Sequence, residues 1–287
     1  MPTHKSLAVV CVVLAMFLAS VGTAAASDIA FYVGAPNVDG WYDASQLDDV
    51  DQIIDEAGRN FRDIQQFDDD QFPGMESWVS DNTDDSELDV LWLNGCMPSV
   101  LYGFPNLDAD GSLIETWLDD GNMIINVGDW FGYVSYECGG RCAENGATGA
   151  ANILDLSSGI IVSADGTQIK RTAAGEQYMP VLDSDVTTDR PISIPAVVDP
   201  WEVAEAFASD SGDADGSRAD PIVIHNTETG AYVAFINQKA GGLGSWIPRG
   251  TAVTEFINNW MTAKVDGFLD VHAHGKAAML WASIKLR

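Results

Sequence analysis

Four residues with ligand-binding chemistry follow two apolar runs, residues 88–93 and 123–127. They are Gly95 and Cys96 after the first run, and Asp129 and Trp130 after the second. A carboxylate beside aromatic rings suits sugar recognition, because the rings stack on sugar faces while the carboxylate accepts hydrogen bonds from hydroxyls. We therefore expect these four residues to bind a polar small molecule or a glycan. The alternative is ordinary core packing of Trp130 and Phe131.

Catalysis at the same place would need an activated nucleophile. A thiol such as Cys96 requires an adjacent base. His225 is the one histidine between the N-terminal segment and the C-terminal tail, and nothing in the sequence brings it to Cys96. We assign no catalytic residue and lean against an enzyme. A hydrolase that uses Cys96 or Asp129 stays the alternative.

A short acidic stretch resembles the first half of a calcium-binding loop, with oxygen-bearing side chains at alternate positions and a glycine at the turn. Its candidate ligands are Asn106, Asp108, Asp110 and Ser112. The twelfth position, where a calcium loop has a bidentate glutamate, is Trp117 instead. We therefore expect no cofactor, with calcium at this loop as the alternative. Without calcium, the stretch is an acidic turn that caps a helix at Ser112.

The N-terminus reads as a secretory signal peptide over residues 1–26. A short positive start precedes the apolar run 7–18, and Ala24–Ala26 supplies the small residues that signal peptidase needs. We expect a secreted or periplasmic protein that begins at Ser27. The net charge of −29 argues against nucleic acid as a partner and against anionic membrane surfaces once the signal is removed.

Three cysteines remain after residue 26, and an exported protein tends to oxidise them. Cys138 and Cys142 flank a glycine-rich turn and are the expected disulfide. The alternative is a disulfide between Cys96 and either Cys138 or Cys142. A zinc site formed by these cysteines is a third hypothesis.

The spacing of apolar residues predicts alternating strands and helices. The expected strands are 28–33, 61–67, 88–93 and 123–127, and the expected helices are 43–58, 112–120 and 251–264. Such alternation favours an α/β protein with a mainly parallel sheet and helices on both faces.

A late β-hairpin is expected where residues 221–225 and 231–237 flank the turn Thr227–Gly230. The glycine- and aspartate-rich stretch 143–220 shows only short apolar pieces. We expect one domain over residues 27–265. The tail 266–287 either docks a protein partner or packs on the domain.

Two stretches resemble the class I glutamine amidotransferase-like superfamily, including its trehalose-utilisation-like and β-galactosidase-trimerisation-like members. The first is Asp89–Pro98 (DVLWLNGCMP), similar to the family's strand and oxyanion-hole turn. The second is Ile114–Trp130 (IETWLDDGNMIINVGDW), similar to its helix, glycine and strand before the nucleophile. The resemblance implies a flavodoxin-like three-layer sandwich.

The family's catalytic positions do not match. Aligning Gly121 with the family's glycine places Gly128 where its cysteine belongs. The stretch Phe235–Ala240 contains neither the family's histidine nor its glutamate. We therefore expect a binding domain without amidotransferase activity. A structural module of an extracellular assembly is a further alternative.

Overall fold

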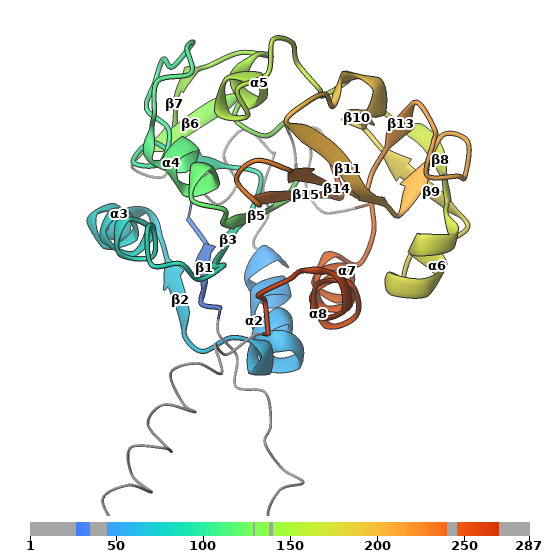
Figure 1. Ribbon diagram of the computed structural model, residues 1–287, viewed down its shortest axis with the longest axis horizontal. Coiled ribbons are helices and arrows are strands. Elements are labelled where there is room, and N and C mark those ends of the chain that lie inside the picture. The colour runs from blue at the N-terminus through green and yellow to red at the C-terminus, as the bar shows by residue number, and fades with distance from the viewer. Residues whose placement is uncertain (1–26, 35–44, 129, 138–139, 240–245, 270–287) are drawn as a thin grey trace, which may run out of the picture.

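A seven-stranded mixed sheet forms the centre of this computed structural model, which describes residues 27–34, 45–128, 130–137, 140–239 and 246–269 (Figure 1). Its strands, in spatial order, are β11 (Trp201–Ala206), β14 (Ile222–Asn226), β15 (Tyr232–Ile236), β5 (Met123–Val127), β3 (Val90–Leu93), β1 (Ile29–Tyr32) and β2 (Ile64–Phe67). Neighbouring strands from β2 to β15 run parallel to one another. β14 pairs antiparallel with both β15 and β11. The predicted α/β class with a mainly parallel sheet is confirmed.

The central strands form where the sequence has continuous apolar runs. Every residue of β1, β3 and β5 is buried, as expected for parallel strands covered on both faces. Their register aligns Ile29 with Val90 and Val90 with Met123, so these strands begin at one edge and end at the other. β2 starts at Ile64, later than predicted, because a short 3₁₀ turn, η2 (Gly58–Asn60), precedes it.

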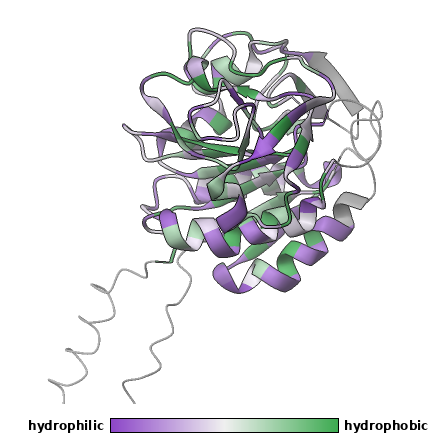
Figure 2. Cartoon of the chain, turned by 90° about the vertical axis from the view of Figure 1, so that its right-hand side faces the viewer, coloured by the Kyte–Doolittle hydropathy of each residue, from purple (hydrophilic) through white to green (hydrophobic). Residues whose placement is uncertain are grey.

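Helices cover both faces of the sheet (Figure 1). One face carries α2 (Ser45–Ala57) and a continuous helical run made of α7 (Arg249–Glu255), the π-helical η5 (Phe256–Met261) and α8 (Thr262–Lys264). The other face carries α3 (Phe72–Asp81) and α4 (Leu113–Asp119). Two hydrophobic clusters, one on each side of the sheet, hold these layers together. Figure 2 shows hydrophobic residues in the sheet and hydrophilic ones on the helices' outer turns.

The predicted late hairpin is confirmed. β14 and β15 pair antiparallel, with Ile222 opposite Phe235 and His225 opposite Tyr232. The turn between them ends at Gly230, whose φ of 86° favours glycine. This hairpin joins the parallel sheet through β15, which pairs with β5.

The stretch 143–220 contains more regular structure than its sequence suggests. A five-stranded sheet consists of β10 (Ile192–Ser193), β13 (Arg218–Ala219), β12 (Ala208–Ser209), β8 (Thr167–Arg171) and β9 (Asp185–Thr188). Largely before this stretch in the chain, a three-stranded sheet consists of β4 (Met97–Pro98), β6 (Val134–Glu137) and β7 (Gly140–Glu144). The remaining helices are α5 (Gly149–Ile153), α6 (Ala173–Tyr178), η3 (Asp69–Gln71) and η4 (Ile194–Ala196). The loop between β9 and β10 reaches the end of β15, where the Asp189 and Arg190 backbone N–H groups donate to the Gln238 carbonyl.

The described chain extends past the predicted domain end at residue 265. Phe268 is fully buried, and its ring centroid lies 5.4 Å from that of Phe61. The predicted signal peptide and residues 270–287 of the predicted tail lie outside the described residues. Of the helices in the described ranges, none has the length and hydrophobicity to cross a membrane.

Candidate functional site

The carboxyl edge of the sheet brings together turns from distant parts of the chain. β1, β3, β5 and β15 are parallel and end at this edge, where α/β sheets usually bind ligands. β14 runs the opposite way and begins here, since Ile222 pairs with Phe235. The residue pair Asp220–Pro221 therefore lies beside the segment Asn237–Gln238 that follows β15.

The turn after β3 holds Gly95 and Cys96 as predicted, but the Cys96 side chain packs inward. The amide of Asn94 organises this turn: its Nδ2 donates to the Gly34 carbonyl, and its Oδ1 accepts from the Cys96 backbone N–H, both at 3.1 Å. Cys96 is only 3% exposed and belongs to a hydrophobic cluster. This burial favours a packing role for Cys96.

The turn after β5 approaches the turn after β3 closely. Gly128 has a φ of 132°, and a Cβ there would lie 3.0 Å from the Asn94 carbonyl oxygen and 3.2 Å from the Gly95 Cα. A nucleophilic side chain at position 128 has no room in this backbone. Asp129, predicted to bind the ligand, lies outside the described residues.

Trp130 is half-buried among polar and aromatic neighbours. Its ring centroid lies 5.3 Å from that of Tyr133, and the Arg190 guanidinium carbon lies 5.5 Å from the Trp130 ring. The buried indole N–H of Trp130 has no hydrogen-bond partner among the described residues. The prediction of core packing holds for Phe131, which is 1% exposed and packs edge-on against Phe235.

A polar cluster at the end of β15 was not predicted from the sequence. The Gln238 backbone N–H donates to Asp220 Oδ2 at 2.9 Å, and the Gln238 carbonyl accepts from the backbone N–H groups of Asp189 and Arg190 at 2.9 and 3.2 Å. The Gln238 side chain is fully buried, and neither its Oε1 nor its Nε2 makes a hydrogen bond within the described chain. A buried amide without hydrogen-bond partners lowers the stability of the fold, and such groups are rare in folded proteins.

Trp246 is fixed at the rim of this cluster. Its backbone N–H donates to Asn237 Oδ1 at 2.9 Å, and its indole N–H donates to Asp189 Oδ2 at 3.2 Å. The other Asp189 oxygen accepts from the Gly166 N–H at 2.6 Å. The Lys239 ammonium lies 4.5 Å from the centroid of the Trp246 ring. Trp246 nevertheless remains 42% exposed, so the structure holds an exposed indole in one orientation.

The electrostatics of the cluster favour a neutral Asp220. Burial raises its pKa to about 7, and the negative charge of Asp189 adds to the shift. Hydrogen bonds from Thr188 and from the backbone of Gln238 and Asn237 oppose this rise. The guanidinium of Arg190 pairs with the carboxylate of Asp165.

In the predicted calcium loop, side-chain oxygens accept hydrogen bonds from backbone N–H groups at and before the start of helix α4. Glu115 accepts from the backbone N–H of Ser112 at 2.6 Å and of Asp110 at 3.3 Å, and Ser112 is the N-cap of α4. Asn106 Oδ1 accepts from the Asp108 N–H at 3.3 Å, and Asn106 Nδ2 donates to Asp110 Oδ1 at 3.3 Å. In the described ranges, no three His, Cys, Asp or Glu side chains are grouped to hold a metal.

The predicted disulfide and His225 are the remaining candidates from the sequence. Cys138 and the side chain of Cys142 lie outside what the structure describes, so their disulfide stays a prediction. His225 pairs with Tyr232, opposite the start of β5, and its Nδ1 lies 3.2 Å from Glu202 Oε1. Cys96 follows the other end of the strands. The structure therefore keeps His225 and Cys96 at opposite edges of the sheet.

The site residues that were not predicted have only weak signals in the local sequence. Asn237 and Gln238 directly follow a buried strand, which is where a ligand edge begins. Asp189 and Trp246 meet only through folding across 57 positions. No known protein family, curated protein or solved structure matches the chain.

Proposed function

We propose that this protein is an exported, non-catalytic domain of the class I glutamine amidotransferase-like type that binds a carbohydrate at the carboxyl edge of its sheet. Counted along the chain, the parallel strands β1, β2, β3, β5 and β15 lie in the order second, first, third, fourth, fifth. That order is typical of flavodoxin-like folds, and it supports the proposed relationship.

The observation that carries the proposal is the exposed but fixed indole of Trp246. An aromatic ring held by hydrogen bonds to Asn237 and Asp189 loses little conformational entropy when a sugar ring stacks on it. The Lys239 ammonium, 4.5 Å from the ring centroid, places N–H donors beside the same ring.

Binding without chemistry fits the residues at this edge better than hydrolysis does. Gly128 carries no nucleophile, and the Cys96 thiol packs within a hydrophobic cluster. A nucleophile also needs an adjacent base, and His225 lies at the opposite edge of the sheet. We therefore expect no glutamine turnover by the purified protein.

A glycan array probed with the exported protein tests the proposal, with Trp246→Ala and Phe104→Ala compared on each positive glycan. Phe104 is a matched control because it is an aromatic residue 41% exposed, in the loop after β4. We expect Trp246→Ala to weaken binding at least about tenfold, since truncating an aromatic anchor at the centre of a binding site costs about 2 kcal/mol or more. Equal losses for both variants would argue against a site at the carboxyl edge.

A further inference from the structure

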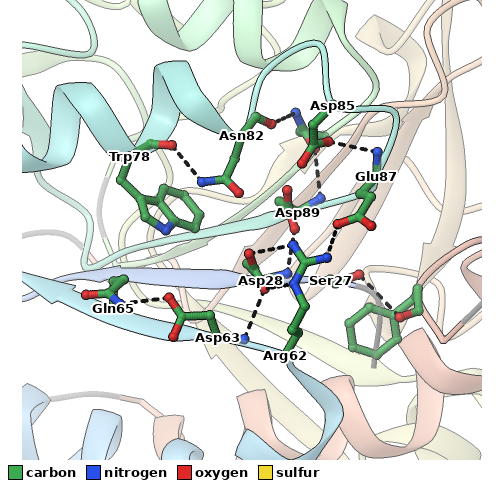
Figure 3. Close-up of polar contacts among 12 residues, drawn as sticks. Ser27, Asp28, Arg62, Asp63, Gln65, Trp78, Asn82, Asp85, Glu87 and Asp89 are labelled. Atoms are coloured by element: carbon green, nitrogen blue, oxygen red, sulfur yellow. Dashed lines mark hydrogen bonds and ion pairs between the residues drawn. The ribbon is translucent and has the colours of Figure 1, made fainter. Parts of the chain in front are cut away.

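The amino edge of the sheet contains a buried carboxylate that the proposed binding site does not use. Asp89 precedes β3 and is fully buried. Its Oδ1 accepts from the Asp28 backbone N–H at 2.5 Å, and its Oδ2 has no hydrogen-bond partner among the described residues. Figure 3 shows Asp89 beside Asp28 and Ser27.

The surrounding charges leave this carboxylate poorly compensated. Arg62 is held by Asp28, with Nε to Oδ1 at 2.9 Å and Nη2 to Oδ2 at 2.7 Å, and it also pairs with Glu87 (Figure 3). Asp85 and Asp28 add negative charge near Asp89, while Arg62 and the hydrogen bond from the Asp28 backbone N–H oppose them. With burial as the main cause, the pKa of Asp89 rises to about 7.

Ser27 is the neighbour of Asp28, whose backbone N–H donates to Asp89, and its own backbone is held in place. Its carbonyl accepts from the Arg62 N–H at 2.8 Å, and its hydroxyl donates to the Phe268 carbonyl at 3.2 Å. Ser27 is fully buried by these contacts. Three bonds join the Ser27 nitrogen to the Asp28 nitrogen, so the two lie no more than about 4.3 Å apart.

We propose that cleavage between Ala26 and Ser27 creates an α-ammonium group that pairs with the buried Asp89 carboxylate, so that removal of the signal peptide stabilises the fold. Hydrolysis breaks the Ala26–Ser27 peptide bond. Water supplies a hydroxyl to the Ala26 carbonyl carbon and a proton to the Ser27 nitrogen, which takes up a second proton from solvent near neutral pH. The proposal rests on the proposed export and is independent of carbohydrate binding.

The electrostatic consequence follows from the position of the new charge. In the uncut chain, the Ser27 nitrogen is an uncharged amide. In the cleaved chain, it carries an amine whose ordinary pKa is about 7.7–8.0. A nearby opposite charge favours an ionised carboxylate, so the proposal predicts that the pKa of Asp89 falls after cleavage.

Comparing two forms of the same chain isolates the effect of the new charge on stability. The first begins at Ser27 with a free amine, and the second is the same chain N-acetylated, where the acetyl carbonyl replaces that of Ala26. Thermal unfolding at pH 7.5 should give the free-amine form a Tm about 3–6 °C higher. At pH 5 the gap should shrink, because protonation of Asp89 removes the pair. Equal Tm values at pH 7.5 would overturn the proposal.

Asp89→Asn is the matched variant, since it keeps the side-chain shape and an acceptor oxygen. In this variant, the free-amine form should be no more stable than the acetylated form at either pH. A gap as large as that of the unmodified sequence would overturn the pairing with Asp89.

Carbon-13 NMR titration of the Asp89 carboxyl group tests the pairing without a substitution. Its midpoint should lie at least one pH unit lower in the free-amine form than in the acetylated form, and equal midpoints would contradict the ion pair. N-terminal sequencing of the exported protein tests the cleavage itself. A start at any residue other than Ser27 would overturn the proposal while leaving carbohydrate binding untouched.

Discussion

The backbone N–H of Gln238 donates a 2.9 Å hydrogen bond to the carboxylate of Asp220, which joins the end of β15 to the residue pair before β14. This bond fixes the segment that also carries Asn237, the acceptor for the Trp246 N–H. Asp220 therefore helps to position the exposed indole through the segment Asn237–Gln238. A buried carboxyl group thus supports the rim of the proposed carbohydrate site.

Asp220 should make stability depend on pH. Its folded pKa of about 7 lies above the unfolded value of about 3.9, so the folded protein binds more protons between these values. The free energy of unfolding should therefore fall as the pH rises from 4 to 7. Asp220→Asn should reduce this loss by roughly 2–4 kcal/mol. Urea unfolding at pH 4.5, 6 and 7.5 measures it, and an unchanged pH dependence in the variant would contradict the assignment.

Gln238→Met should stabilise the protein. Methionine has a similar size and removes an amide that is buried without partners, a gain of about 1–3 kcal/mol. Chemical denaturation measures the gain. Gln168→Met is the control, because Gln168 is exposed and donates to Thr187 Oγ1, and it should change stability by less than about 0.5 kcal/mol. Lower stability in Gln238→Met would mean that the folded protein does satisfy this amide.

Gly128→Ala should destabilise the fold by about 2–4 kcal/mol. Position 128 has a φ of 132°, and a Cβ would press on the Asn94 carbonyl oxygen. Gly103→Ala is the control, because a Cβ there meets nothing within 4 Å, and it should cost less than about 1 kcal/mol. Thermal unfolding compares the two. Similar Tm values for both variants would show that position 128 tolerates a side chain.

Cys96→Ser should lower stability without changing ligand affinity. The substitution places a hydroxyl in a hydrophobic cluster, which costs about 1–3 kcal/mol. Denaturation and carbohydrate titration of the same preparation separate the two effects. The unsubstituted protein should also release no ammonia from glutamine. Glutamine hydrolysis that disappears in Cys96→Ser would make Cys96 a displaced nucleophile.

The parallel half of the fold was predictable because its strands are continuous apolar runs. β3 and β5 are buried at every residue, and the hairpin of β14 and β15 carries a clear turn sequence. α3 was missed because the acidic stretch at residues 68–70 reads as a simple strand end. In the structure, Asp68 and Gln71 cap the turn that leads into that helix.

The small sheets and most of the site were beyond local pattern analysis. β8 has one fully buried residue among five, and β10, β12 and β13 have two residues each, too few to show periodicity. The turns carrying Gly95 and Trp130 were predicted from strand ends. Trp246 and Asp189 meet through tertiary packing, so their spacing holds no signal.

The most direct test of carbohydrate binding at the carboxyl edge is calorimetric titration of the best glycan from an array into the unsubstituted protein, Trp246→Ala, Gln238→Met and Phe104→Ala. The account predicts measurable binding that falls at least about tenfold in Trp246→Ala and stays within about twofold in Gln238→Met, whose side chain is buried, and in Phe104→Ala. Absence of any glycan ligand, or affinity that is the same in all four proteins, would contradict it.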